Sequence, residues 1–106
     1  MSLSNELHKK TAAEVRQVQV DFQGKLDTGE TLTGTPTATP DSGITAGTVT
    51  KNSSEITVNG TAVPANKGLQ FTVSGGTLNT TYNILLSCGT TGSQTLNHTI
   101  RVLIVS

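Results

Sequence analysis

Tryptophan is absent from the sequence, and cysteine occurs once, at Cys88. A single cysteine excludes a disulfide within the chain, so packing and hydrogen bonds must hold the fold together. Cys88 falls in a row of alternating apolar residues and has no cationic neighbour in the sequence. We therefore expect a small buried hydrophobic residue at this position and not a reactive thiol.

Charge is scarce and balanced, with seven Lys and Arg against seven Asp and Glu in 106 residues. The sequence has no basic stripe of the kind that supplies phosphate contacts in nucleic-acid-binding proteins. Long apolar runs are also missing, so we expect neither a membrane span nor a secretory signal. The predicted partners therefore include no nucleic acid and no membrane, and synthesis in a bacterial cytoplasm fits these features.

The patterns that metal and catalytic sites need are missing as well. His98 has no histidine, cysteine or carboxylate at ligand spacing, and a metal site needs a converging set. We interpret His98 as a strand residue on or near the core face. No Gly-x-Ser-x-Gly segment is present, and Gly75-Gly76 falls between strands instead of before a helix. The sequence predicts no enzyme activity, no metal and no cofactor.

One triplet, Asp27-Thr28-Gly29, is shared with retroviral-type aspartic proteases. Those enzymes need two aspartates, one from each of two subunits, that share a proton. Here Lys25 replaces an apolar residue of the protease pattern, and Glu30 adds a carboxylate beside the triplet. A turn is the favoured interpretation because Asp and Gly suit turns, and a retropepsin-like protease is the third functional hypothesis.

The sequence is rich in threonine, with 20 residues, and in glycine, with 11. The branched Cβ of threonine suits a pleated surface, and helix-forming residues are scarce beyond the N-terminal segment. Composition therefore predicts an all-β fold. Apolar residues alternate with polar ones in three consecutive runs near the C-terminus, which predicts three strands joined by tight turns. Their inward rows are Leu69, Phe71 and Val73, then Tyr82, Ile84, Leu86 and Cys88, then Ile100, Val102 and Ile104.

Earlier segments add further strands. Residues 14–22 alternate in the same way, and two prolines favour a sheet edge for residues 31–39. Asn59-Gly60 predicts a type I′ hairpin. In all, about seven to eight short strands predict an Ig-like antiparallel β-sandwich over residues 14–106. Residues 1–13 are expected to form an N-terminal arm that is flexible or contains a short helical turn from Leu7 to Lys10.

Tyr82 opens a strand after a polar run. In β-sandwiches a tyrosine at such a corner often hydrogen-bonds back to the nearby backbone. The alternative is an ordinary half-buried aromatic residue. Ile84 occupies the position at which an antibody-type domain has a cysteine, so the sequence excludes a disulfide-pinned immunoglobulin domain.

The last two predicted strands carry apolar residues on both faces. Leu85, Leu103 and Val105 lie opposite the inward rows, and a strand with two apolar faces is covered on both sides. One interpretation is cover by the chain's own N-terminal segment. The other is cover by another subunit, with Leu85, Leu103 and Val105 as interface residues together with Leu3 and Leu7 of the arm.

Several short segments occur in a recognisable order. They are Asp21-Phe22, Leu26, Gly29-Glu30-Thr31-Leu32, Phe71 to Thr77, Tyr82-Asn83-Ile84, Thr91-Gly92 and Arg101 to Val105. This order, which covers most of residues 15–106, resembles the phage fibre–tail adaptor family. The sequence lacks the family's usual tryptophans and has extra residues around Lys51 to Asn66. The resemblance implies an Ig-like virion protein that links the tail to fibres. Its implied partners are itself, as a homo-oligomer, and other virion proteins such as tail or fibre subunits.

A second functional hypothesis is a carbohydrate-binding or adhesive Ig-like module. Threonine-rich strands and Gly/Asn loops fit such a module, and sandwiches often bind ligands at their loop ends. The three aromatic residues, Phe22, Phe71 and Tyr82, all fall on inward rows, whereas sugar platforms usually need exposed aromatic faces. The virion hypothesis is therefore favoured.

Overall fold

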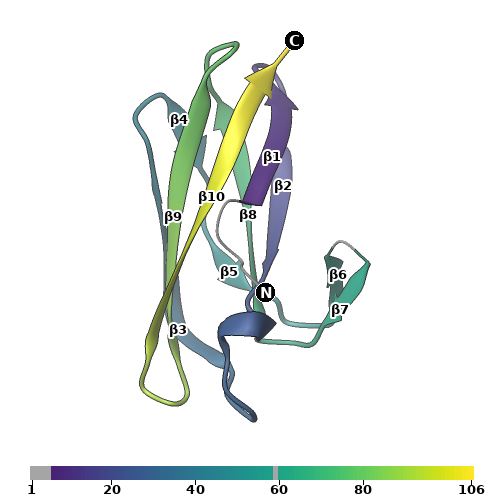
Figure 1. The fold of residues 1–106 in the computed structure, drawn as a ribbon, viewed down its shortest axis with the longest axis vertical. Helices are drawn as coiled ribbons and strands as arrows, with labels where there is room; N and C mark the ends of the chain where they lie inside the picture. Colours follow the sequence, from purple (N-terminus) through teal and green to yellow (C-terminus); the bar gives the residue numbers. More distant parts are fainter. Residues whose placement is uncertain (1–5, 59) are drawn as a thin grey trace.

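The computed structural model describes residues 6–58 and 60–106, except the side chains of Glu6 and Leu7 (Figure 1). This part of the chain forms ten strands and one 3-10 turn, η1 (Gln23–Lys25). The strands are β1 (Glu6–Thr11), β2 (Arg16–Asp21), β3 (Leu32–Pro40), β4 (Ile44–Ala46), β5 (Thr50–Lys51), β6 (Ile56–Val58), β7 (Thr61–Val63), β8 (Gly68–Gly75), β9 (Thr81–Thr90) and β10 (Thr95–Val105). None of the helical structure within the described ranges is long and apolar enough to cross a membrane.

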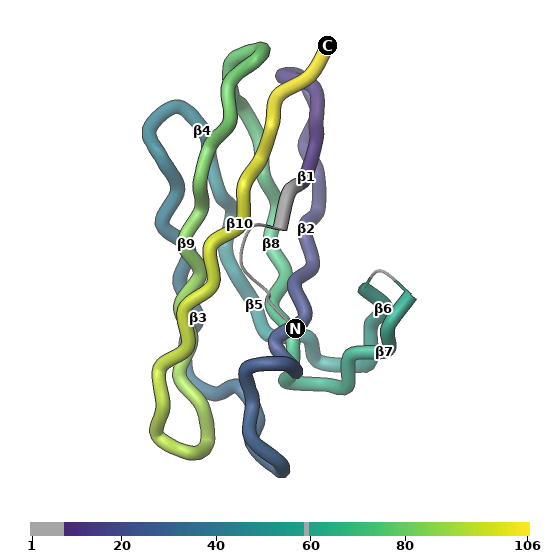
Figure 2. The backbone as a smooth tube through the Cα atoms, viewed as in Figure 1, coloured from purple at the N-terminus to yellow at the C-terminus, as the bar shows by residue number. Residues whose placement is uncertain are grey.

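Two sheets face each other, and a small hairpin stands apart from them (Figures 1 and 2). Sheet A has the strand order β1-β10-β9-β3, and sheet B has the order β2-β8-β4, with β5 also paired to β8. The β1–β10 pair is parallel, and the other pairs are antiparallel. The all-β sandwich is confirmed, whereas its Ig-like character stays a prediction.

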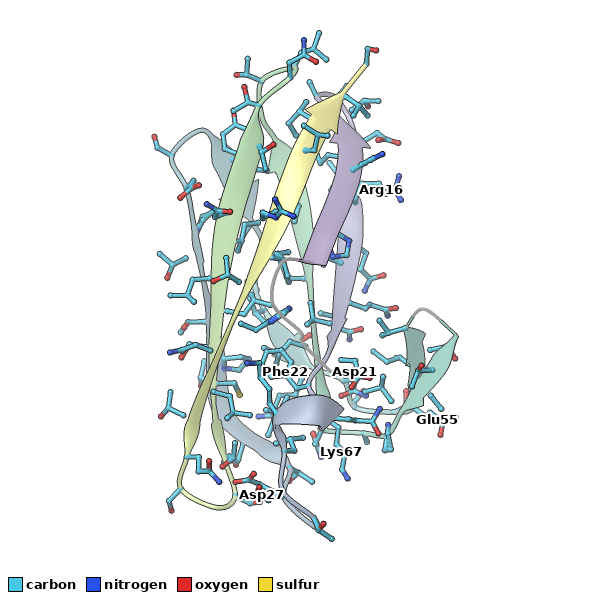
Figure 3. The ribbon with its side chains drawn as sticks, in the orientation of Figure 1. Arg16, Asp21, Phe22, Asp27, Glu55 and Lys67 are labelled. Carbon is cyan, nitrogen blue, oxygen red and sulfur yellow. The ribbon has the colours of Figure 1, made fainter. Side chains whose placement is uncertain are left out.

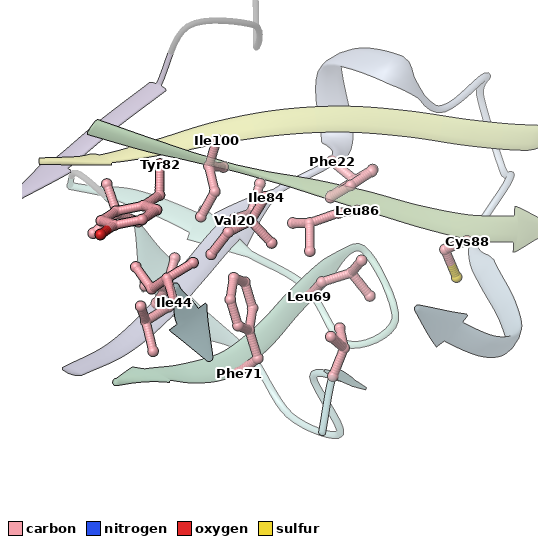
Figure 4. Close-up of a cluster of buried hydrophobic side chains, with 14 of the residues drawn as sticks. Val20, Phe22, Ile44, Leu69, Phe71, Tyr82, Ile84, Leu86, Cys88 and Ile100 are labelled. Carbon is pink, nitrogen blue, oxygen red and sulfur yellow. The ribbon is translucent and has the colours of Figure 1, made fainter. Parts of the chain in front are cut away.

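The inward rows predicted from alternation form the core between the two sheets (Figure 4). Fully or almost fully buried side chains come from both sheets: Val18, Val20, Phe22, Leu69, Phe71 and Val73 from β2, β8 and the segment beside them, and Ile84, Leu86, Ile100, Val102 and Ile104 from β9 and β10. Burying one such large side chain contributes about 1.5–3 kcal/mol. A period of two was therefore a reliable guide to the core.

The structure differs from expectation at β1. Where the sequence suggested a flexible arm or a helical turn from Leu7 to Lys10, residues Glu6–Thr11 form an edge strand paired with β10. This strand and the division of residues 44–50 into β4 and β5 account for the difference between ten strands and about seven to eight. The parallel partner of β1 lies almost a whole chain length away, so local sequence patterns could not predict the pairing.

Lys10 fixes the end of β1 to sheet B. Its side chain is on the inward row and only 2% exposed. Its Nζ donates hydrogen bonds to the carbonyl oxygens of Thr11 (2.6 Å), Gly75 (2.6 Å) and Ala12 (3.4 Å). These carbonyls compensate for the lost hydration of a buried ammonium group. Since Gly75 ends β8, Lys10 joins the two sheets at this end of the sandwich.

Strand β3 is the other edge of sheet A, as its prolines predicted. Its pairing with β9 shifts register between Thr33 and Thr37, and Gly34 has a φ of +76° in this irregular segment. Two carbonyl oxygens in this irregular segment accept hydrogen bonds from side chains. Lys51 Nζ donates to Gly34 O (2.5 Å), and Cys88 Sγ donates to Thr33 O (3.4 Å). An edge strand broken in this way is a poor template for further strand addition.

The predicted hairpin is present as β6 and β7, which stand to one side of the sandwich (Figure 1). Gly60 has a φ of +80°, as its place in the predicted turn requires, while Asn59 lies outside the described residues. The base of the hairpin is held by the fully buried Asn52. Its Nδ2 donates to the carbonyls of Ser54, Val63 and Pro64, and its Oδ1 accepts from the Lys67 and Gly68 amides.

Candidate interaction surfaces

The outer face of sheet A, called here the apolar face, carries Leu85, Leu103 and Val105. Each alternates with buried residues of β9 or β10 and therefore points away from the core. Leu85 is 41% exposed and lies between Thr39 of β3 and Thr99 of β10. Leu85 thus has an uncharged threonine beside it on each neighbouring strand.

The outer face of sheet B has a different composition. Gln17 and Gln19 of β2 lie opposite Thr72 and Gln70 of β8, and Gln19 Nε2 donates to Gln70 Oε1 (3.3 Å). Thr50 of β5 pairs with Gln70 from the other side. These positions are uncharged and polar, so the two broad faces of the molecule differ in chemistry.

The structure distinguishes among the predicted interface residues. Leu85 is exposed, whereas Leu103 and Val105 are half-buried. Strand β1 contributes to their cover, because Lys9 lies beside Leu103 and Thr11 lies beside Val105 in the β1–β10 register. Leu7 pairs with Arg101 through the backbone, while its side chain and the whole of Leu3 lie outside the described residues. The interface role of these five residues stays a prediction.

Two exposed apolar side chains were missed by the sequence analysis. Val15, in the turn between β1 and β2, is 68% exposed, and Leu78, in the turn between β8 and β9, is 48% exposed. Lys10 connects these turns through its hydrogen bonds to Ala12 and Gly75. For Leu78 the signal was a large apolar residue between polar residues in a predicted turn, whereas Val15 follows Ala12, Ala13 and Glu14 and had no such signal.

Asp27-Thr28-Gly29 forms a turn, as the favoured interpretation predicted. The Glu30 amide donates to Asp27 O (2.9 Å), Gly29 has a φ of +79°, and Asp27 is exposed. Gln94 Nε2, from the turn between β9 and β10, donates to Asp27 Oδ2 (2.9 Å) and to Glu30 Oε2 (3.2 Å). The triplet therefore ties two loops together at one end of the sandwich.

Glu30 is the buried member of this turn, at 5% exposure. Its carboxylate accepts hydrogen bonds from the Asp27 amide (3.0 Å) and the Thr90 hydroxyl. These two bonds, led by the one from Asp27, hold the pKa of the Glu30 carboxyl below its usual value. Gly92 makes room for the arrangement, since a Cβ there would collide with Glu30 Oε2.

Tyr82, His98 and Cys88 are buried side chains that contribute to packing. The Thr77 amide donates to the Tyr82 hydroxyl (2.9 Å), which is the corner hydrogen bond that the sequence suggested. His98 is buried with its ring edge-on to Phe22, at a centroid distance of 5.8 Å. Cys88 is buried, and burial raises the pKa of its thiol. Within the described ranges no three His, Cys, Asp or Glu side chains gather into a possible metal site.

Comparison with known proteins gives one family. Neither the curated proteins nor the solved structures contain a match to the chain. The family model described as podophage GP4 fiber-tail adaptor protein gp77 matches residues 10–103. This span begins within β1 and ends within β10, so it takes in nearly the whole sandwich. The chain therefore belongs to the podophage GP4 fibre–tail adaptor family, gp77, and is a structural component of the phage virion.

Proposed function

We propose that this chain links tail and fibre by burying its apolar face against neighbouring subunits and that it catalyses no reaction. The neighbours are further copies of the chain and the adjoining tail or fibre subunits. The observation that carries the proposal is the exposure of Leu85 in the middle of sheet A, flanked by threonines and accompanied by the half-buried Leu103 and Val105. The outward pair Asn83 and Arg101 lies between Leu85 and Leu103 on this face, and exposed apolar surface bordered by polar residues is typical of protein–protein contacts.

The energetics favour a contact at this face over one at sheet B. Full burial of a leucine contributes about 1.5–3 kcal/mol, so covering the exposed part of Leu85 would contribute roughly 1 kcal/mol. The half-buried Leu103 and Val105 add to this on the same surface. Covering the glutamines of sheet B, like covering Asn83 and Arg101 of sheet A, removes water from polar groups, which is unfavourable unless each finds a partner. Sheet A offsets this cost with Leu85, Leu103 and Val105, and sheet B has no leucine on its outer face to do so.

The carbohydrate-binding alternative is supported less well. Phe22, Phe71 and Tyr82 are all buried, with exposures of 0%, 3% and 7%. These are the only aromatic residues in the sequence. A sugar platform would therefore have to be built from the threonine and asparagine side chains of the surface.

Phage complementation tests the proposal. A phage that lacks this gene would be supplied with the wild-type protein, with Leu85→Lys or with Thr45→Lys. Thr45 is exposed on the outer face of sheet B and serves as the matched control. We expect Leu85→Lys to reduce the number of fibres on purified virions and to leave more of the variant protein unincorporated, whereas Thr45→Lys should behave as wild type. Normal fibre attachment by folded Leu85→Lys protein would contradict the proposal.

A further inference from the structure

Strands β1 and β2 lie next to each other at one side of the sandwich (Figure 1). A groove there is lined by residues of both strands and of β8 and β10. Its volume is about 360 Å³. Three buried valines, Val18, Val73 and Val102, line its floor, and Lys9 and Arg16 are at its rim. An apolar floor with cations at the rim favours a ligand that has both apolar and negatively charged groups.

Cations occupy positions in this groove where the strand pattern calls for apolar residues. Lys10 pairs with the buried Ile104, and Arg16 pairs with the buried Val73, so both belong to inward rows. The ammonium group of Lys10 already donates hydrogen bonds to the carbonyl oxygens of Thr11 and Gly75. Arg16 lies 3.7 Å from the Glu14 carboxylate, with side-chain exposures of 56% and 41%. Such an exposed ion pair contributes little, so Arg16 is able to bind an anion from outside.

The backbone beside the groove also favours a peptide. In the sheets formed by the described residues, β1 is the end strand of sheet A and β2 is the end strand of sheet B. An extended peptide can add to the edge of a sheet through main-chain hydrogen bonds, while its alternate side chains enter pockets. One row of its side chains would face the valine floor beside Arg16, and the other row would lie near Lys9 on the outward face of β1.

We propose that the groove between β1 and β2 binds an extended, acidic peptide segment of another virion protein. Charge complementarity selects this occupant, since the rim carries Lys9 and Arg16 and the floor accepts apolar side chains. Residues 1–5 of this chain, Met-Ser-Leu-Ser-Asn, contain no acidic residue and so do not offer the complementary charge. The groove does not include Leu85, whereas its residue Lys9 lies beside Leu103 of the apolar face. Arg16, which lies on sheet B, therefore tests the groove separately from the apolar face.

Nuclear magnetic resonance of the full-length, isotope-labelled protein tests the proposal with defined peptides. The probe is a capped peptide of alternating valine and glutamate, and the matched controls replace glutamate by glutamine or by lysine. We expect the glutamate peptide to shift the amide resonances of Lys9 to Thr11 and Arg16 to Val18, and the lysine peptide to leave them in place. Raising the salt from about 0.1 M to about 1 M shortens the screening length from about 10 Å to about 3 Å and should weaken binding.

Charge-reversal variants locate the contact. Arg16→Glu and Lys9→Glu change exposed side chains and should weaken binding of the glutamate peptide roughly threefold or more. Lys67→Glu makes the same change in net charge at the opposite end of the molecule and should leave the affinity unchanged (Figure 3). Leu85→Lys should also retain peptide binding, which separates this test from the test of the apolar face.

Three results would overturn the proposal. The first is an absence of shifts with all peptides, which would mean that the inward cations only protect the edge strands from unwanted pairing. The second is equal binding of the glutamate and lysine peptides. The third is a set of shifts centred on β3, the opposite edge of sheet A.

Discussion

Asn52 shows how a polar side chain is accommodated in this core. Its amide nitrogen donates to three carbonyl oxygens, of Ser54, Val63 and Pro64, at 2.8–3.1 Å. Its amide oxygen accepts from the Lys67 and Gly68 amides at 3.2 and 3.0 Å. A buried polar group is stabilising only when its partners are present. The side chain therefore links β8 to both ends of the hairpin segment.

The substitution Asn52→Asp tests this role with almost no change of shape. It replaces a donor by an acceptor, so three carbonyl oxygens would face a buried carboxylate. We expect the free energy of unfolding to fall by about 3 kcal/mol or more, measured by urea denaturation. Asn97→Asp, on an exposed position of β10, is the matched control and should change stability little. Equal stability of the two variants would contradict the role assigned to Asn52.

Glu30 makes stability depend on pH. Its pKa is lowered in the folded protein by hydrogen bonds from Asp27 and Thr90, so the charged form stabilises the fold above the unfolded-state pKa. That contribution is lost as the pH falls from about 4.3 through the lower folded-state pKa. The stability difference between wild type and Glu30→Gln should therefore be constant near neutral pH and shrink in acid. Parallel stability curves for the two proteins down to low pH would show that Glu30 is not the titrating group.

At the scale of elements, β1 is the strand that the local alternation of apolar and polar residues did not predict. The core rows of β2, β8, β9 and β10 were predicted correctly because apolar and polar residues alternate there. In β1 the inward row includes Lys10, which is buried through carbonyl partners and not through apolar character. The same residue types would suit an exposed arm. The signal that makes this segment a strand comes from β10, about a whole chain length away.

Replacing Lys10 tests how β1 is held. Lys10→Ala removes the hydrogen bonds to Thr11 O and Gly75 O and should cost about 1.5–3 kcal/mol locally. We expect the amides of β1 to exchange with solvent faster, while those in the β3–β9 pair stay protected. Lys9→Ala, on the outward row of the same strand, is the control. Unchanged protection of β1 in Lys10→Ala would mean that its pairing with β10 is sufficient alone.

The hairpin was predicted in part. Asn59-Gly60 predicted a hairpin because that dipeptide suits positive φ angles, and β6 and β7 form the hairpin with Gly60 at a positive φ. The sequence did not show that Asn52, several residues earlier, would hold its base. An asparagine in a polar segment is usually solvated, and its burial depends on Val63, Pro64 and Gly68 converging around it in three dimensions.

For the whole molecule, sequence patterns predicted the two-layer β architecture, the core rows and the edge position of β3. The candidate interface was predicted only as a set of apolar positions. The structure separates them into the exposed Leu85 and the half-buried Leu103 and Val105. That separation depends on which strand lies beside β10, which is a long-range property. The turns bearing Val15 and Leu78 were missed because a single apolar residue has no periodicity.

The topology also predicts slow folding. Sheet A pairs the beginning of the chain with its end, as in His8 beside Val102, and each sheet contains pairs that are distant in sequence. Forming such contacts requires closing large loops before any apolar burial compensates. We expect refolding from urea to take milliseconds to seconds in stopped-flow fluorescence of Tyr82. Refolding within microseconds would be inconsistent with this pairing.

The difference between the two broad faces has a consequence for any assembly. If each copy buries the leucines of sheet A, it must turn its glutamine-lined side the opposite way. A layer built from such molecules then has an inner and an outer surface fixed by the chain itself. Thr45, on the outer face of sheet B and away from the groove, would mark the side left open to solvent, and a label attached there would report the orientation of every copy in the particle.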